Sequence, residues 1–439
     1  MATLVLKLAK IKAQIAVGDL IQHLVIAILL VLGIHLLVIY KSAVIALSDQ
    51  WWWVKLYLVL TGFFLFSRFF ILFFYRDKHD DGHNLERQGQ EYPSVSFIIA
   101  AKDEGPMIYR SIATCLGSHY PGRMECVAID DGSSDQTQAE MLRAQATHGE
   151  QLVKVISFDR NRGKREAMAE GILASVGEIL IFVDSDSFLV PDAARHLVWH
   201  FLHNPGLGAV AGNSGVANER RNWLTRMQSA RYGTSFNIFK ACESVFGLVT
   251  CCPGCFSAYR RAAVLPILTA WREQMLWGTR STFGDDRSLT NFVLRRWEVA
   301  YCRRARAITV VPERYRQFFK QQLRWKKSWV REGWEAATFI WRKHPLAAAF
   351  FYINLLLPLL GPVVVLYALI GWIVWGVSPL FFVLGVLYLS LLYGLLYFWQ
   401  SRNIYWWYIA PFTLLYMLVL VWQMPYAILK LKDTSWGTR

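Results

Sequence analysis

The sequence predicts an α/β domain inserted between transmembrane helices, and three observations support this architecture. Of the 439 residues, 54% are hydrophobic and only 18% are charged, whereas soluble domains are about 45–50% apolar and about 25% charged. The apolar excess lies in long runs toward both ends of the chain. Between them, from Arg76 to His344, the composition is ordinary, and short β-rich runs alternate with helix-like stretches.

Five apolar runs reach the roughly 20 residues that a helix needs to cross the hydrocarbon core of a membrane. Tryptophans gather near their ends, as in the aromatic belts of membrane proteins. Pro358 and Pro362 are expected to interrupt the third run, which would then be re-entrant or form two short spans, so the number of C-terminal spans stays open. The runs are Leu20–Leu47, Trp51–Tyr75, Pro345–Trp375, Pro379–Trp399 and Ile404–Leu429.

Basic residues beside the apolar runs predict the orientation of the chain. Lys7 precedes the first run, Arg76 follows the second and Arg342 precedes the third. Such residues favour the cytoplasmic side, so we expect a multi-pass plasma-membrane protein with its central domain in the cytoplasm. Five spans would place Lys430 and Arg439 outside, against this rule. The first 30 residues show no cleavage site typical of a signal peptide.

The net charge of +15, from 47 basic and 32 acidic residues, calls for anionic partners. Lipid headgroups and phosphate-bearing substrates meet that need, and nothing besides the net charge indicates a nucleic acid. The high apolar content excludes a disordered chain. The expected division is a membrane region with two helices (1–78), the cytoplasmic domain (79–311), interfacial helices (312–344) and a membrane region with about three helices (345–439).

Four short apolar runs in the central segment predict the strands of a parallel sheet with helices on both faces. They are Ser94–Ala101, Cys126–Ile129, Lys154–Phe158 and Ile179–Val183. Ligands bind beyond the carboxyl ends of such strands, and acidic residues follow three of them: Asp103 and Glu104, Asp130 and Asp131, and Asp184 and Asp186. Each pair alone could be a turn or a helix cap. Their convergence on one edge predicts a ligand site.

Asp184 and Asp186 are expected to bind a divalent cation. Alternate residues at a strand end face the same side, and carboxylate oxygens suit Mg²⁺ or Mn²⁺. Such ions take further ligands from substrate phosphates, and the sequence has no P-loop pattern. A diphosphate held by a metal without a P-loop indicates a nucleotide-sugar donor, whose leaving diphosphate the metal would stabilise.

The cysteines Cys251, Cys252 and Cys255 include the Cys-x-x-Cys spacing of some zinc and redox sites. No second pair and no nearby histidine accompanies them, and the cytoplasm is reducing. We therefore expect packing thiols in a turn rather than a metal site or a disulfide.

A set of motifs then points to a family. In the order and spacing of processive family 2 glycosyltransferases, the chain has Asp130-Asp131-Gly-Ser, Asp184-Ser-Asp186, Gly284-Asp285-Asp286-Arg287 and Gln321-Gln-Leu-Arg324-Trp325. The set resembles the membrane-embedded synthases of hyaluronan, chitin and cellulose. Phe283-Gly-Asp-Asp-Arg-Ser-Leu-Thr-Asn291 and Asn161-Arg-Gly-Lys-Arg165 are most similar to hyaluronan synthases. The resemblance runs from about Pro93 to about Glu332 and implies a GT-A-type, Rossmann-like domain, with a gating-loop-like segment in 312–344.

The resemblance, combined with the chemistry, assigns roles. Asp286 would be the general base that takes the proton of the acceptor hydroxyl, with Asp285 and Arg287 orienting it; Asp285 is the alternative base. Asp186 would bind Mg²⁺ or Mn²⁺ together with Asp184, and Trp325 would stack on the acceptor sugar. The residues expected to bind the nucleotide sugar are Asp103, Asp131, Lys164, Asp184, Gln321 and Arg324.

Simpler interpretations exist for two of these motifs. Asp285-Asp286-Arg287 could be a helix N-cap with a local ion pair, and Arg324-Trp325 could be an interfacial anchor. Two departures from hyaluronan synthases concern the product. Cys251-Cys-Pro-Gly-Cys replaces their usual Cys-x-Ser-Gly-Pro-Leu and leans toward chitin-oligosaccharide synthases, and Ser288 stands where they commonly carry histidine.

The function that the sequence favours is a processive inverting glycosyltransferase. It would elongate a β-linked extracellular polysaccharide from UDP-sugars and export it through its own membrane region. The best specific expectation is hyaluronan from UDP-GlcNAc and UDP-GlcUA, and the alternative is a chitin-like or other single-sugar β-glycan. A membrane-anchored binding or transport protein is the alternative from another class. The expected partners are the donors, the growing polysaccharide and the lipid bilayer.

Overall fold

The fold comes from a computed structural model that describes residues 52–77, 91–376 and 378–433. The predicted first span, Leu20–Leu47, lies outside the described residues, and so do Lys7 and Arg439. The first described element is helix α2 (Trp52–Leu72), which covers most of the second apolar run.

A mixed eight-stranded sheet forms the centre of the molecule, in the order β3-β2-β1-β4-β7-β6-β10-β5. The four predicted strands are present and mutually parallel. The sheet as a whole is mixed, because strands outside the four predicted ones reverse direction: β7 runs antiparallel to β4 and β6, and β5 runs antiparallel to β10. The strands are β1 (Val95–Ala101), β2 (Met124–Asp130), β3 (Val153–Ser157), β4 (Ile179–Phe182), β5 (Ser187–Leu189), β6 (Leu207–Val216), β7 (Ser257–Arg260) and β10 (Glu298–Thr309).

The direction of β7 follows from where its preceding loop lies. The Cys251–Phe256 loop sits at the carboxyl end of β4, where a Cβ added at Gly254 would lie 3.1 Å from an Asp184 carboxylate oxygen. A strand that starts at this edge must run back across the sheet, opposite to β4. Sequence alternation could not reveal this, because strand direction depends on a loop contact between distant residues.

Helices cover both faces of the sheet, as predicted. Alternating side chains of β1 face opposite sides: Ile98 belongs to one apolar cluster, and Phe97 and Ile99 belong to the other. One face packs against α4 (Gly105–Leu116), α5 (Thr137–His148) and α7 (Ala193–His203). The other packs against α6 (Lys164–Ala174), α10 (Arg261–Val264), α11 (Leu268–Arg272) and α12 (Asp285–Leu294).

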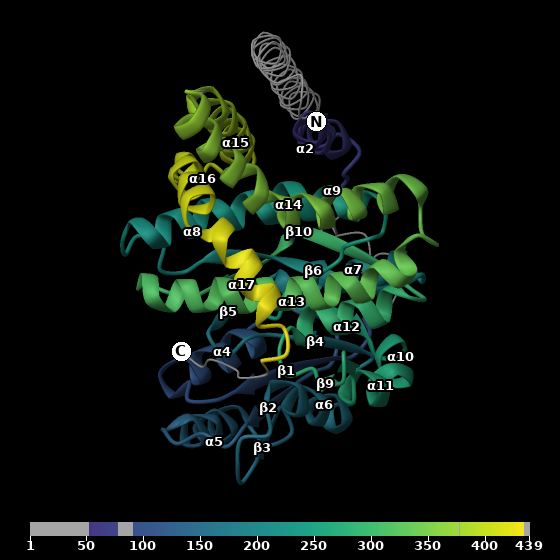
Figure 1. The fold of residues 1–439 in the computed structure, drawn as a ribbon. Helices are drawn as coiled ribbons and strands as arrows, with labels where there is room; N and C mark the ends of the chain where they lie inside the picture. The colour runs from purple at the N-terminus through teal and green to yellow at the C-terminus, as the bar shows by residue number, and fades with distance from the viewer. Residues whose placement is uncertain (1–51, 78–90, 377, 434–439) are drawn as a thin grey trace, which may run out of the picture.

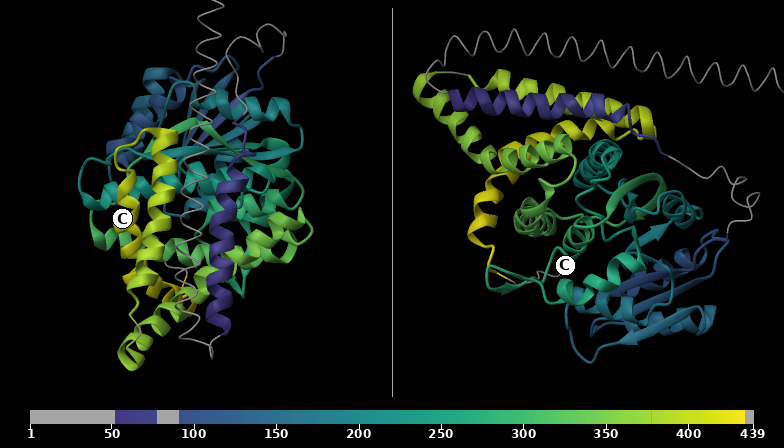
Figure 2. Two further views of the ribbon diagram at one scale, coloured as in Figure 1. Left: turned by 90° about the horizontal axis from the view of Figure 1, so that it is seen from above. Right: turned by 90° about the vertical axis from the view of Figure 1, so that its right-hand side faces the viewer.

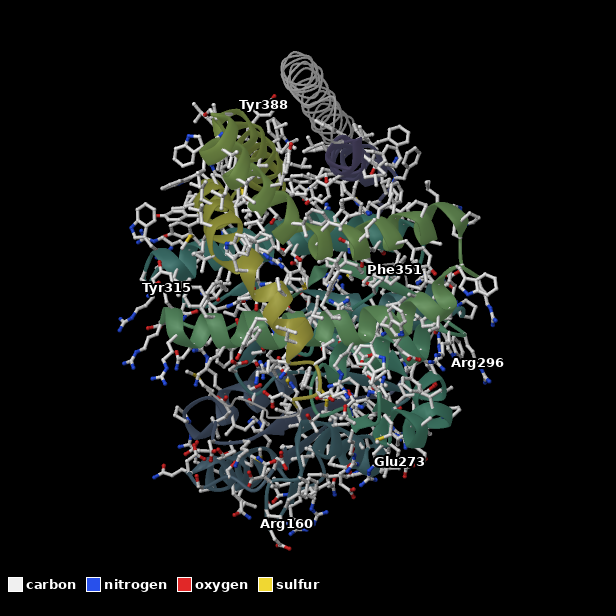
Figure 3. The ribbon with its side chains drawn as sticks, in the orientation of Figure 1. Arg160, Glu273, Arg296, Tyr315, Phe351 and Tyr388 are labelled. Atoms are coloured by element: carbon white, nitrogen blue, oxygen red, sulfur yellow. The ribbon has the colours of Figure 1, made fainter. Side chains whose placement is uncertain are left out.

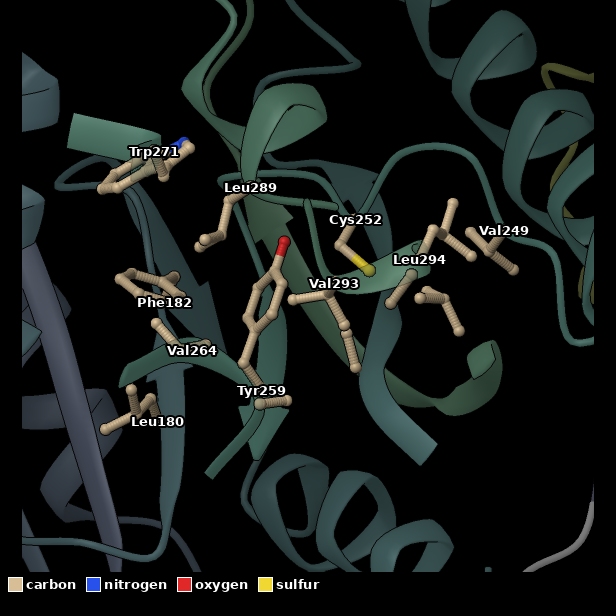
Figure 4. Packing of buried hydrophobic residues seen from close by; sticks show 14 of the residues in the cluster. Leu180, Phe182, Val249, Cys252, Tyr259, Val264, Trp271, Leu289, Val293 and Leu294 are labelled. Carbon is tan, nitrogen blue, oxygen red and sulfur yellow. The ribbon is translucent and has the colours of Figure 1, made fainter. Parts of the chain in front are cut away.

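The apolar cluster that contains Ile98 also includes residues of α12, the helix that carries the Gly-Asp-Asp motif. Leu289 and Val293 of α12 pack with Phe182 of β4, Tyr259 of β7 and Trp271 of α11, all almost completely buried (Figure 4). Burying an aromatic or aliphatic side chain of this size contributes about 1.5–3 kcal/mol. The apolar face of α12 therefore anchors the helix on the sheet, with its N-terminus at the acidic edge.

Several shorter elements connect the sheet to the long helices. Helix α8 (Trp223–Thr234) continues into the π-helix η1 (Ser235–Lys240) and α9 (Ala241–Val245). Gly233 of α8 lies so close to the Tyr397 ring that an added Cβ would clash with it. The remaining short elements are η2 (Leu265–Ile267), β8 (Met275–Leu276) and β9 (Thr279–Arg280).

The segment after β10 is dominated by two long helices. Helix α13 (Tyr315–Ile340) is one 26-residue amphipathic helix that carries the Gln-x-x-Arg-Trp motif. Helix α14 (Pro345–Trp375) is continuous through Pro358 and Pro362, so the predicted interruption is wrong. Proline is tolerated in apolar helices where neighbouring groups satisfy the freed carbonyls.

The C-terminal apolar runs also form helices. Both α14 and α15 (Leu380–Ser401) are long and apolar enough to cross a membrane. The last run bends by 46° between its two halves, and it makes a third candidate if the bent pair counts as one span. Leu56–Leu72 of α2 is apolar but shorter. The bent run comprises η3 (Trp406–Tyr408), α16 (Ile409–Leu418), η4 (Leu420–Trp422) and α17 (Gln423–Leu429).

The apolar helices and the outer strands lie at opposite ends of the molecule. Helices α2 and α15 are at one end, whereas β3 and α5 are at the other, with α13 and α14 between them (Figures 1 and 2). Figure 3 shows the same arrangement: Tyr388 lies at the end formed by the apolar helices, and Arg160 lies at the opposite end. At the start of α12, Gly284 lies against Ser328 of α13.

Candidate active site

Asp131 lies at the carboxyl end of β2, buried under the loop that leads into α6. Its carboxylate accepts backbone hydrogen bonds from Arg162 (2.6 Å) and Gly163 (3.0 Å). Burial raises the pKa of this carboxyl, against the lowering effect of these two bonds. Asp130 makes the simpler contact of a turn, accepting from the Ser133 N–H at 3.1 Å. Of the two neighbours, Asp131 therefore holds the loop that presents Lys164.

Asp103 lies at the neighbouring strand end and is exposed. It has a left-handed backbone with φ of 55°, which is uncommon outside glycine. Its carboxylate accepts hydrogen bonds from the N–H and the hydroxyl of Ser134 (2.8 and 3.1 Å), and the backbone bond lowers its pKa. The first two acidic strand ends are thus joined, as the sequence predicts.

Asp184 and Asp186 follow β4 at the centre of the same edge. Asp184 is half-buried and forms an ion pair with Lys164. Asp186 is buried and accepts a hydrogen bond from the Thr309 hydroxyl at 3.2 Å. Burial by itself would lower the pKa of Lys164, but Asp184, Asp286 and Asp285 together raise it above its usual range. Lys164 is therefore a fixed cation among these acids.

Asp285 and Asp286 occupy the first turn of α12. Gly284 precedes them with φ of 79°, and a side chain there would collide with Ser328 of α13. Only glycine combines this backbone with so close a helix contact. The start of α12 is therefore pinned against α13.

The two adjacent aspartates have different surroundings. Asp285 is buried and accepts a 2.7 Å bond from Arg165 Nε. Asp286 is half-buried; it accepts from the Arg287 N–H at 2.8 Å and lies 3.7 Å from the Cys251 thiol. In the described ranges Arg287 forms no ion pair with either carboxylate. The cation that orients Asp285 is Arg165, which sequence reasoning missed because the two lie 120 positions apart.

The cysteine loop is where three acidic groups meet. Burial raises the pKa of the Cys255 thiol, and the charges of Asp184, Asp186 and Asp286 raise it further. Cys255 also lies 2.9 Å from the Ser214 hydroxyl. These thiols are free. Asp184, a predicted metal ligand, and Asp286, the predicted base, therefore lie against one loop, at Gly254 and at Cys251. No spacing in the sequence indicated this placement.

Helix α13 brings the Gln-x-x-Arg-Trp motif to the same region. Trp325 is 38% exposed, with its ring 6.4 Å from that of Tyr232 on α8. Burial raises the pKa of Tyr232, with contributions from Cys255, Asp186 and Asp184. The amide oxygen of Gln321 is buried and has no hydrogen-bond partner in the part of the chain that the structure describes.

The residues at the edge fit a divalent cation of the Mg²⁺ or Mn²⁺ kind. Asp184 and Asp186 offer carboxylate oxygens, the ligand type that such ions prefer. Asp184 lies against Gly254 of the cysteine loop, and Asp186 accepts a hydrogen bond from Thr309 at the same end of the sheet. Lys164 pairs with Asp184, and Asp286 lies at Cys251 of the same loop. The arrangement could hold a cation together with the phosphates of a substrate.

Comparison with known proteins agrees with this geometry. Residues 96–267 match the family described as Glycosyl transferase family 2. These residues are therefore similar to a family 2 glycosyl transferase domain. The matched segment runs from β1 into η2 and includes Asp103, Asp131, Lys164 and the Asp184–Asp186 pair. The resemblance drawn from the motifs is confirmed.

Curated relatives fall into two groups. An N-acetylglucosaminyltransferase of Bradyrhizobium diazoefficiens is 33% identical over 285 residues, covering 64% of this chain and 57% of the relative. One of Rhizobium leguminosarum bv. viciae is 34% identical over 55% of this chain and 56% of the relative. The chain thus spans little more than half the length of these relatives. A hyaluronan synthase of Streptococcus pyogenes is 26% identical over 361 residues, 80% of this chain and 84% of the synthase.

A solved structure supports the fold. The mannosyltransferase of Pyrobaculum calidifontis, in complex with GDP-Man and Mn²⁺, superposes with a TM-score of 0.59 and 18% sequence identity. The match covers 87% of this chain and 99% of that one. It confirms the predicted α/β, GT-A-type architecture.

Proposed function

We propose that the protein is a processive inverting glycosyltransferase that elongates a β-linked polysaccharide from UDP-sugars. The observation that carries the proposal is that Asp184 and Asp286 both lie against the cysteine loop, Asp184 at Gly254 and Asp286 at Cys251. Asp186 is two residues from Asp184, and Trp325 lies on the helix that contacts Gly284. Such a transfer needs two carboxylates that hold a metal ion, a base and an aromatic ring on which the acceptor sugar can stack.

The donor side of the proposed site is formed by the strand ends and the loop before α6. Asp103 and Asp131 would hold the uridine, and Lys164, Gln321 and Arg324 would face the diphosphate, for which a guanidinium fork is well suited. Asp186, with Asp184, would hold Mg²⁺ or Mn²⁺. When bound, this ion supplies Lewis-acid stabilisation of the leaving diphosphate. The buried amide oxygen of Gln321 could accept a hydrogen bond from a hydroxyl group of the UDP-sugar.

Asp286 is the proposed base. It would accept the proton of the acceptor hydroxyl as that oxygen bonds to the anomeric carbon and the bond to UDP breaks. One direct displacement inverts the configuration, so an α-linked UDP-sugar gives a β-linked product. No carboxylate nucleophile is required, in contrast to a retaining glycosidase. Asp285 serves to orient Asp286 rather than to take the proton, since Arg165 already occupies it.

Trp325 is the proposed acceptor platform. Its exposed ring, next to Tyr232, offers an apolar face on which a sugar ring can stack. The same helix then leads to α14 and the other apolar helices. A polymer that leaves the site along α13 would reach them directly, which supports export through the membrane region.

We further propose a multi-pass protein with residues 79–311 as a cytoplasmic catalytic domain and 312–344 at the membrane surface. Helices α14 and α15 and the bent last run are the C-terminal span candidates. Basic residues such as Arg342 and Lys343, between α13 and α14, would face anionic headgroups of the inner leaflet. The lipid bilayer would then be a permanent partner.

Hyaluronan, from UDP-GlcNAc and UDP-GlcUA, is the proposed product. The hyaluronan synthase match extends over 80% of this chain, beyond the catalytic domain. A chitin-like product is the second candidate, because the N-acetylglucosaminyltransferases are more identical, at 33–34%, and because of the Cys251-Cys252 doublet. Both candidates need a GlcNAc donor.

The test uses the purified full chain in lipid nanodiscs with Mn²⁺ or Mg²⁺. UDP release is measured with UDP-GlcNAc alone, with UDP-GlcUA alone and with both. Polymer formed only when both donors are present supports hyaluronan, and polymer from UDP-GlcNAc alone supports the chitin-like product. If a panel of UDP-sugars yields no UDP at all, the enzyme proposal fails and a binding or transport role takes its place.

A further inference from the structure

A buried polar network lies beneath the proposed site and joins three of its elements. At its centre is Arg165 in the first turn of α6, next to Lys164. Its side chain is 5% exposed, and every guanidinium nitrogen has a partner. Nε donates to Asp285 (2.7 Å), one terminal nitrogen donates to the Trp271 carbonyl and to Gln274 (3.1 Å each), and the other donates to Ser281 (3.2 Å).

The network continues from α12 to α13 through Gln274. Its side-chain oxygen accepts from Arg165 and from the Ser288 hydroxyl, while its nitrogen donates to the Glu332 carboxylate at 3.4 Å. Asn291 of α12 donates to the same carboxylate at 3.2 Å and to the Glu332 backbone carbonyl at 2.9 Å. The helices that carry Lys164, Asp286 and Trp325 are therefore linked through one buried set of hydrogen bonds.

We propose that Arg165 is a positioning residue for the transfer step: by holding Asp285, it fixes the first turn of α12 so that Asp286 faces the acceptor. The inference rests on the proposed function. Adjacent helix positions point about 100° apart, so the direction of Asp285 sets that of Asp286. Gly284 against Ser328 prevents the turn from sliding along α13.

A purely stabilising role for this pair has less physical support. A buried ion pair loses much of its attraction to desolvation, and apolar replacements of similar volume are often equally stable. What the guanidinium adds is direction, since its planar fork fixes several partners at set angles and a lysine cannot do so. The two neighbours on α6 therefore have different partners. Lys164 pairs with Asp184, a proposed metal ligand, and Arg165 pairs with Asp285 in the network.

The test compares Arg165→Lys with a matched control, Arg272→Lys. Arg272 also pairs with a carboxylate of α6, Glu166, but it is more than a third exposed and lies outside the network. For each variant in nanodiscs, we would measure UDP affinity by calorimetry, the apparent melting temperature, and kcat and KM for UDP release at saturating acceptor. A second variant, Gln274→Met, removes both arms of the link with little change in volume.

We expect Arg165→Lys to lower kcat by 10- to 100-fold while UDP affinity and the donor KM change by less than three-fold. Gln274→Met should lower kcat by about three- to ten-fold, and Arg272→Lys should match the wild type. A folded Arg165→Lys variant with wild-type kcat overturns the inference, as does a loss of kcat that only follows a loss of UDP affinity. If neither network variant folds, the network acts on stability and the inference is also overturned. If the wild type releases no UDP, the proposed function fails first and the inference fails with it.

Discussion

The edge of the sheet and the buried network beneath it both contain carboxylates, but these differ in solvent exposure and in hydrogen bonding. At the edge, Asp103, Asp184 and Asp286 are exposed or half-buried. Beneath it, Asp285 and Glu332 are sealed and bonded by several neutral or cationic donors. The three groups proposed to meet a substrate are accessible, whereas Asp285 and Glu332, which would set the geometry of α12, are buried. The adjacent residues Asp285 and Asp286 differ in this way: Asp285 is buried, and Asp286 is half-buried.

The largest effect is expected at Asp286. Asp286→Asn keeps the shape and removes the base, so transfer should fall by about 10²–10⁴-fold, while UDP affinity stays within a few-fold. UDP release at saturating donor, paired with calorimetry of UDP binding, measures both. The exposed Asp192→Asn, at the start of α7, is the control. Substantial turnover in Asp286→Asn would move the base to another carboxylate, with Asp285 next to be tested.

The second largest effect is expected at the proposed metal ligands, Asp184 and Asp186. Asp186→Asn removes one carboxylate from the proposed cation site, so we expect the Mn²⁺ concentration for half-maximal activity to rise at least ten-fold. Chelation of the wild type with EDTA should abolish UDP release, and added Mn²⁺ should restore it. An unchanged metal titration in Asp186→Asn would show that this buried carboxylate belongs to the scaffold rather than to the accessible edge.

Trp325 should affect product length more than turnover. Trp325→Ala removes the proposed sugar platform, so polymers should shorten while initial UDP release falls by only about three- to ten-fold. Gel electrophoresis of the product measures length. Trp334→Ala, on the same helix and 62% exposed, is the control for general effects on α13. Polymers of normal length from Trp325→Ala would favour the interpretation of this tryptophan as a membrane anchor.

The smallest effect is expected from Glu332 and concerns stability. Burial raises its pKa to about 7, so between pH 4.5 and 7 the folded chain keeps a proton that the unfolded chain has lost. Stability from this group therefore falls as the pH rises from about 4.5 to about 7, by up to about 3 kcal/mol in total. Glu332→Gln should remove that loss, and its melting temperature relative to wild type should be higher by a few degrees at pH 8 than at pH 5.5. The same difference at both pH values would contradict a neutral Glu332.

Sequence patterns predicted the local elements well. The four strands before Asp186 are confirmed because alternation and apolar runs are local properties. The predicted break at Pro358 and Pro362 was wrong, since an apolar environment retains helices that proline would end in water. The direction of β7 was also missed, because it depends on where the cysteine loop meets Asp184.

The sequence by itself determined the chemistry available to this protein: which carboxylates stand at strand ends, which motif sits on an amphipathic helix and which runs suit a membrane. These follow from residue type and short-range periodicity. Only the tertiary structure decided how the two aspartates of α12 differ, because Arg165, Gln274 and Glu332 reach Asp285 from remote parts of the chain. Burial and hydrogen-bond geometry are properties of the packed molecule, and they separate a proposed catalytic base from the residue that holds it in place.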